Sequence, residues 1–190
     1  MSEPGPTFAQ IETTLKRVAQ ILRDADVDVA LAGSIAAWAR GGPESCNDLD
    51  LLVRPQDADR ALAALGDAGL RTERPPEGWL VKAYDGDVLV DLIFAPNGEP
   101  EVEPLFARAD DLRASALPVQ VMAIEDVLVA KLRSFDEHYL DFAGLLQIAR
   151  ALREQIDWAQ VRERTEGSPY ARAFLYLAEL LEVSPRAVTG

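Results

Sequence analysis

Cysteine and long apolar runs are almost missing from this sequence of 190 residues. The one cysteine, Cys46, has no partner for an internal disulfide, which is typical of a protein in the reducing cytoplasm. No apolar run approaches the roughly 20 residues that cross a membrane, and the polar start of the chain lacks the basic segment of a signal peptide. We therefore expect a cytoplasmic protein with no membrane partner.

Basic residues are also few, with 19 Lys and Arg against 32 Asp and Glu and a formal net charge of -13. A surface of this average charge repels polyanions, which disfavours an extended nucleic-acid interface but leaves room for a local basic cleft. Apolar residues make up 48% of the chain, enough to bury a core. The length fits one domain, or a small domain with an extension.

The apolar periodicity changes along the chain and divides it into two parts. A capping box, Thr7 with Gln10, starts the first expected helix. Strands are expected over 27–31, 49–53, 79–84, 87–94 and 119–122, and helices over 8–24, 35–40, 56–68, 124–135 and 138–153. Further helices are expected to start at Asp157, Ser168 and Ser184. This order predicts an α+β fold, with a small mixed sheet and helices on one side over 1–122 and a helical C-terminal extension over 123–190.

Two acidic residues, Asp48 and Asp50, stand at the start of an expected strand. Side chains alternate along a strand, so both carboxylates point to the same side, where they repel one another. A divalent cation between them relieves this repulsion, because Mg²⁺ prefers hard oxygen ligands. The alternative is a solvated strand start, since the Asp-x-Asp pattern arises often by chance in so acidic a chain.

A third carboxylate, Asp91, lies inside an expected strand that is apolar on both faces, Val88 to Phe94. Such a strand is buried in its sheet. An unpaired buried carboxylate costs roughly several kcal/mol unless its pKa shifts or it finds a cation. A structural ion pair with an arginine is the alternative, but a third metal ligand explains the position better.

The pair Gly33-Ser34 lies between an expected strand and a helix, ahead of the Asp pair. Glycine lets the backbone approach a ligand closely, and free N–H groups at a helix start favour phosphate. An ordinary strand-to-helix turn is the alternative. The order and spacing of this pair relative to Asp48 and Asp50 are what make it informative.

These elements together resemble the motif set of the polymerase-beta-like nucleotidyltransferases over about residues 27–95. The resemblance implies that Gly33 and Ser34 hold a nucleoside triphosphate. It also implies that Asp48, Asp50 and Asp91 are catalytic and bind Mg²⁺, with one or two ions.

The helical continuation is similar to the AbiEii and MenT-type proteins of that superfamily, many of which are toxins of toxin–antitoxin pairs. Those proteins carry a lysine on one helix and an aspartate on the next, positions that Lys131 and Asp141 match. The family often has an arginine before the Asp pair, where this chain has residues 44–47 without one, and a second aspartate where this chain has Gly144. Both differences leave the three aspartates intact.

Two lysines are candidates from the pattern itself. Lys131 continues the apolar helical stripe of Ile124, Val127 and Leu128, so it either extends out from a core edge or meets an anion such as phosphate. Lys82 follows from a hairpin with Asp85-Gly86 as its loop, which puts it on the face of Asp91, one diagonal step away. Lys82 could then neutralise Asp91 or contact a phosphate. The sole histidine, His138, is expected to be partly exposed.

Three classes of function compete. The first is a magnesium-dependent nucleotidyltransferase that moves a nucleoside monophosphate from an NTP to a small molecule or an RNA end. The second is a toxin that acts on tRNA and has a protein antitoxin as partner. The third is a non-catalytic nucleotide-binding module, which the intact set of aspartates argues against. The charge balance favours the small acceptor or the RNA end over a long RNA footprint.

Overall fold

A computed structural model describes residues 5–45, 48–96 and 101–186. Its sheet has seven strands in the order β3-β4-β5-β2-β1-β7-β6. The strands are β1 Val29–Leu31, β2 Leu49–Val53, β3 Arg71–Glu73, β4 Leu80–Asp85, β5 Val88–Ile93, β6 Asp110–Ala114 and β7 Leu117–Val121. Strand β2 pairs in parallel with β5, and β1 in parallel with β7, whereas the other neighbours are antiparallel. The sheet is therefore mixed, as expected from the sequence.

The helices are α1 Phe8–Asp24, α2 Gly33–Ala39, α3 Ala58–Asp67, α4 Glu103–Ala107, α5 Ile124–Arg133, α6 Phe142–Leu152, α7 Trp158–Thr165 and α8 Pro169–Leu180, with a short 3-10 turn over Pro55–Asp57. The capping box of Thr7 and Gln10 is present at the start of α1. Caps on Asp157 and Ser168 start α7 and α8 as predicted. The expected α+β fold followed by helices is confirmed, while the division at residue 122 into two domains stays a prediction.

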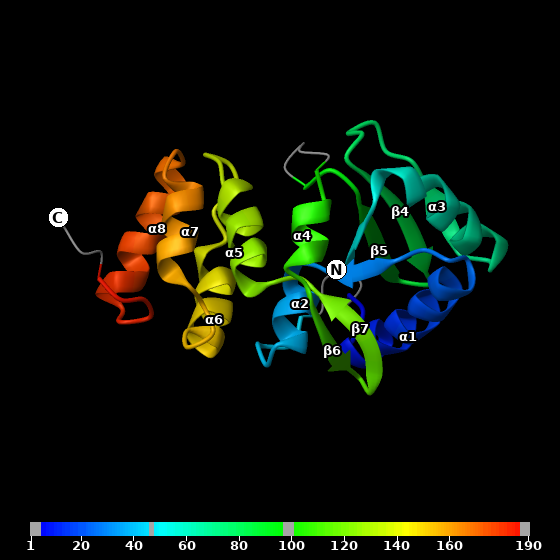
Figure 1. The fold of residues 1–190 in the computed structure, drawn as a ribbon, viewed down its shortest axis with the longest axis horizontal. Coiled ribbons are helices and arrows are strands. Elements are labelled where there is room, and N and C mark those ends of the chain that lie inside the picture. Colours follow the sequence, from blue (N-terminus) through cyan, green and yellow to red (C-terminus); the bar gives the residue numbers. More distant parts are fainter. Residues whose placement is uncertain (1–4, 46–47, 97–100, 187–190) are drawn as a thin grey trace.

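The layers follow from the apolar patterns. One stripe of α1 is buried at helical spacing, namely Ile11, Leu15, Val18 and Leu22. Helices α1 and α3 contact each other and the β4–β5 hairpin, so they cover one face of the sheet there. Helices α5 to α8 form the other end of the molecule, where α5 packs against α2 as well as α7 and α8 (Figure 1). Burying one such aliphatic side chain contributes about 1.5–3 kcal/mol, so this packing fixes the strands that carry the site.

The loop of the β4–β5 hairpin differs from the prediction by one residue. Asp85 pairs with Val88, so Gly86 and Asp87 form the loop, and Gly86 takes a left-handed φ of 61° that favours glycine. When a two-residue loop moves by one position along the chain, each residue of one strand pairs with a residue two positions further along the other strand. Each side chain therefore keeps its face of the sheet. Lys82 is therefore directly opposite Asp91 rather than diagonal to it.

Two further regions differ from the sequence-based expectations. No helix or strand was expected between residues 95 and 118, yet this part of the chain contains the short α4 and the edge strand β6. The helix expected from His138 begins at Phe142, because Asp141 caps it by accepting a hydrogen bond from the Gly144 amide at 2.9 Å. The residues just before it, 136–140, form a turn. Cys46, and most of the helix expected after Ser184, lie outside the described residues. Among the helices of the described ranges, none is long and apolar enough to cross a membrane.

Candidate active site

Three carboxylates meet at the centre of the sheet. Asp50 on β2 and Asp91 on β5 are direct partners across the parallel pair, and Asp48 stands two residues before Asp50. One carboxylate oxygen from each of the three lies within 4.8 Å of the others. Asp91 is buried, with 7% of its surface exposed, and the other two are partly exposed. The sheet register therefore places Asp50 and Asp91, which are 41 positions apart in the sequence, next to one another.

Gly33 lies directly against Asp50. The amide of Ala32 donates a hydrogen bond to the Asp50 carbonyl at 3.0 Å, so the end of β1 is tied to the acidic strand. Gly33 has a φ of 52°, and a Cβ at this position would collide with the Asp50 carboxylate. Both facts require glycine. Ser34 does not cap α2, since Ala32 is the N-cap residue and has no side chain for this role. Its side chain lines a pocket instead.

Lys82 forms an ion pair with one of the three carboxylates, that of Asp91. Its Nζ lies 3.1 Å and 3.5 Å from the two carboxylate oxygens of Asp91, so the partner of Asp91 is a lysine and not the arginine considered above. Burial raises the pKa of Asp91, and the hydrogen bond from Lys82 offsets part of that rise. For Lys82, burial lowers the pKa, but the hydrogen bond and charge of Asp91 outweigh it and leave the pKa raised.

Asp50 has a pKa well above the ordinary value of an aspartate. Burial, followed by repulsion from Asp48 and Asp91, raises its pKa to about 7, against opposing contributions from Lys131 and Lys82. Two ammonium groups therefore act on three carboxylates, and neither forms a hydrogen bond to Asp50 in the described part of the chain. This excess of negative charge is what a bound cation would relieve.

A pocket of about 250 Å³ opens between α2 and the helices α5 and α6. The predicted residues Ser34, Lys131 and Asp141 all line it. The carboxylate of Asp141 folds back over Gly144, where a Cβ would collide with it. With Asp141 in this position, Gly144 has no room for a side chain. His138 is exposed and pairs only with its neighbour Glu137 at 3.3 Å within the described residues.

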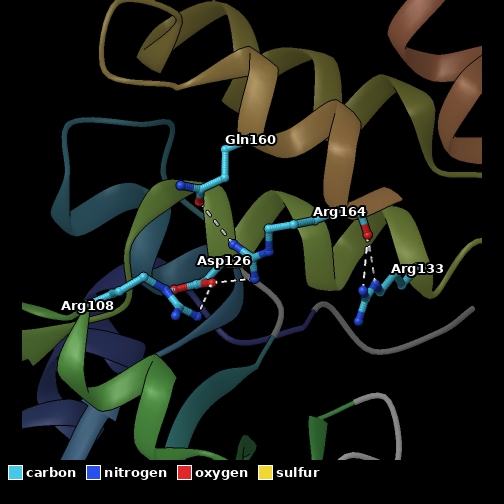
Figure 2. A network of polar contacts seen from close by, with 5 residues as sticks. All are labelled: Arg108, Asp126, Arg133, Gln160 and Arg164. Carbon is cyan, nitrogen blue, oxygen red and sulfur yellow. Dashed lines mark hydrogen bonds and ion pairs between the residues drawn. The ribbon is translucent and has the colours of Figure 1, made fainter. Parts of the chain in front are cut away.

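A second polar cluster was not foreseen from the sequence. Asp126 on α5, with 2% of its surface exposed, accepts hydrogen bonds from Arg108 at the end of α4 and from Arg164 on α7. Figure 2 shows the two guanidinium groups approaching the carboxylate from opposite sides, and Arg133 donating to the Arg164 carbonyl. No sequence signal separates this aspartate from the solvent-facing acids around it, because its partners lie 18 and 38 residues away.

Solved structures share this architecture. The solution structure of the antibiotic-resistance factor ANT(2″)-Ia aligns with a TM-score of 0.67 at 13% identity, over 93% of this chain and 99% of that one. Its crystal structure with adenylyl-2″-tobramycin aligns with a TM-score of 0.63 at 15% identity, over 88% and 98%. The lincomycin-bound lincosamide adenylyltransferase LnuA gives 0.55 at 13% identity, over 76% and 98%. At these identities the likeness establishes the fold.

A family model matches the sequence itself over residues 9–183, nearly the whole chain. The protein therefore belongs to a family described as uncharacterised nucleotidyltransferases, and it is an enzyme of that class. No curated protein matches the sequence significantly. The predicted nucleotidyltransferase class and the fold class are thereby confirmed.

Proposed function

We propose that this nucleotidyltransferase uses Mg²⁺ to transfer a nucleoside monophosphate from an NTP to a small acceptor. The observation that carries the proposal is the group formed by Asp48, Asp50 and Asp91, whose oxygens approach within 4.8 Å of one another. Gly33 packs directly against Asp50, with no side chain between its backbone and that carboxylate. A cluster of carboxylates suits a metal-bound triphosphate.

The residues present fit a divalent cation. Three oxygen ligands on two neighbouring strands supply the hard donors that Mg²⁺ prefers, and the raised pKa of Asp50 marks negative charge that the protein leaves unbalanced. Asp48 and Asp50 would hold the ion on the triphosphate, and Asp91 would share a second ion. When bound, the ions neutralise phosphate charge and favour loss of the acceptor proton.

Two lysines supply positive charge near the carboxylates and the proposed phosphate site. Lys131 is close enough to Asp50 to lower the pKa of that carboxyl and lines the adjoining pocket, so its ammonium can contact phosphate oxygens. Lys82 holds Asp91 in its present orientation through the 3.1 Å hydrogen bond. Ser34 and Asp141 face the same pocket and complete the proposed nucleotide-binding set.

The reaction is a displacement at the α-phosphorus. An acceptor oxygen forms a bond to this phosphorus, the bond to the bridging oxygen breaks, and pyrophosphate leaves with the electron pair. The acceptor proton passes to solvent. Such chemistry depends mostly on positioning and charge neutralisation, and here the sheet would supply the positioning and the bound cations the neutralisation.

A small acceptor is favoured by the charge distribution. Arginines across the described surface already pair with carboxylates, including Arg17 with Asp85, Arg40 with Asp110 and Arg54 with Glu103. These carboxylates compete with a long phosphate backbone, on which RNA affinity depends, for the same cations. ANT(2″)-Ia with adenylyl-2″-tobramycin and LnuA with lincomycin are structural neighbours that hold small antibiotics, which supports a small hydroxylated acceptor here.

The test is incubation of the protein with each α-labelled NTP and Mg²⁺, together with either a metabolite extract or total RNA. We expect labelled small products, pyrophosphate release, and turnover that changes little between about 50 and 200 mM salt. Steep salt dependence with an intact tRNA would overturn the small acceptor and favour a toxin with an antitoxin partner. No labelled product from any NTP would overturn the transferase assignment to this site.

A further inference from the structure

Tyr139 presents an exposed aromatic ring at the nucleotide pocket. It lines the same 250 Å³ pocket as Lys131 and Ser34, and 53% of its surface is exposed. Large aromatic side chains are usually buried, so an exposed ring in a pocket marks surface that a ligand can cover.

A tight turn holds the backbone of Tyr139. The carboxylate of Asp136 accepts hydrogen bonds from the amides of His138 and Tyr139 at 2.7 and 2.9 Å. The Asp136 amide in turn donates to the Tyr139 carbonyl at 3.2 Å. The turn closes on itself, so the exposed ring is presented by an ordered segment.

A chain of aromatic contacts connects this ring to the core. The Tyr139 ring centroid lies 6.0 Å from that of Phe135, which lies 5.3 Å from that of Phe142. Phe142 makes an edge contact at 5.5 Å with Phe174, which is fully buried. Centroid separations of 4.5–7 Å are those of interacting aromatic pairs, so the exposed ring is supported from below.

We infer that Tyr139 is the surface on which the base of the bound NTP stacks. The inference rests on the proposed function and adds the residue that binds the nucleoside part. If Lys131 contacts the phosphates, the rest of the nucleotide extends from it into the pocket it shares with Tyr139. The pocket is smaller than the roughly 300–1,000 Å³ of sites for drug-sized ligands, which suits one base and leaves the acceptor to bind outside it.

Stacking does not depend on a particular pattern of hydrogen bonds, because every base has a π-face. We therefore expect all four NTPs to bind, with purine nucleotides binding more tightly than pyrimidine nucleotides. This order follows from the larger face of a purine.

The experiment measures binding of ATP, GTP, CTP, UTP and inorganic tripolyphosphate by calorimetry in the presence of Mg²⁺. Tyr139→Ala should weaken NTP binding by roughly 5- to 150-fold, the range for loss of one base–aromatic contact. Tripolyphosphate binding should change less than twofold, because this probe has no base. Tyr139→Phe should retain NTP affinity, since it keeps the ring.

The matched control is Tyr176→Ala on α8, because Tyr176 is also a tyrosine and is 62% exposed, away from the pocket. It should leave both affinities unchanged. Unchanged NTP affinity in Tyr139→Ala, or an equal loss for NTP and tripolyphosphate, would overturn the stacking role alone. If the unmodified protein binds neither NTP nor tripolyphosphate, the proposed function is overturned, and the inference with it.

Discussion

Two groups of carboxylates in the described part of the chain differ in how their negative charge is balanced. Asp126, between α4, α5 and α7, receives three hydrogen bonds from Arg108 and Arg164, so two guanidinium charges surround one carboxylate. The group at β2 and β5 places three carboxylates together, with lysines as the opposing charges.

The difference separates a structural ion pair from the proposed metal site. Around Asp126 the charge and hydrogen bonds are satisfied within the fold, and the cluster joins segments that are distant in the sequence. Around Asp50 the charge is left in excess, which raises the pKa of its carboxyl to about 7. Unbalanced charge costs stability, and a fold retains it where a ligand supplies the missing charge.

The largest expected effect is on catalysis. Asp50→Asn removes one proposed metal ligand, and Mg²⁺-dependent transfer should fall by at least about 10³-fold, equivalent to several kcal/mol of transition-state stabilisation. The measurement is pyrophosphate release under saturating NTP and Mg²⁺. Full activity in this variant would contradict a catalytic role for the three aspartates.

The second effect is on folding and concerns the other cluster. Arg108→Met combined with Arg164→Met leaves Asp126 buried without its cations, and the free energy of unfolding should fall by about 3–5 kcal/mol. Chemical denaturation measures it. Adding Asp126→Leu to this pair should recover much of the loss, because an apolar side chain needs no partner. No loss in the double variant would mean that the arginines do not compensate Asp126.

The third effect is the pH dependence of the metal-free protein. Asp50 has a pKa of about 7 when folded against an ordinary value of 3.8, so the folded state binds the proton more tightly. Its contribution to stability is complete below pH 3.8 and is lost as the pH rises to 7. With EDTA present, we expect the free energy of unfolding to fall by about 2–4 kcal/mol over that interval.

The comparison with Asp50→Asn isolates this group, because other titrations cancel in the difference between the two proteins. The variant should lack the decline and should be the more stable of the two at pH 7.5 without metal. Millimolar Mg²⁺ should restore the stability of the unmodified protein at that pH. A difference between the proteins that does not vary with pH would contradict the raised pKa.

The smallest effect concerns the lysine on α5. Lys131→Met keeps the aliphatic stem and removes the charge, so NTP affinity should fall by about 1.5–3 kcal/mol while stability barely changes. Calorimetric titration with NTP and Mg²⁺ measures it, with the exposed Lys16→Met on α1 as the matched control. Equal affinities in the two variants would leave Lys131 as a surface residue with a packed stem.

Much of the site could be predicted from the sequence because its signals are local. Alternation along β2 puts Asp48 and Asp50 on one side, and the apolar surroundings of Asp91 mark it as buried. The hairpin loop could not be placed to one residue, since Asp85, Gly86 and Asp87 all suit a turn. Lys82 nevertheless kept its face, because a shift of the loop by one residue moves each pairing by two.

The sequence by itself determined the class of fold, the acidic group and the glycine beside it, because periodicity and turn chemistry act within a few residues. Only the tertiary structure decided which distant groups meet. Lys82 faces Asp91 through a register, Arg108 and Arg164 reach Asp126 across three helices, and Tyr139 reaches the pocket from the turn between α5 and α6. These contacts depend on how whole elements pack, and packing is set by the core as a unit rather than by any local pattern.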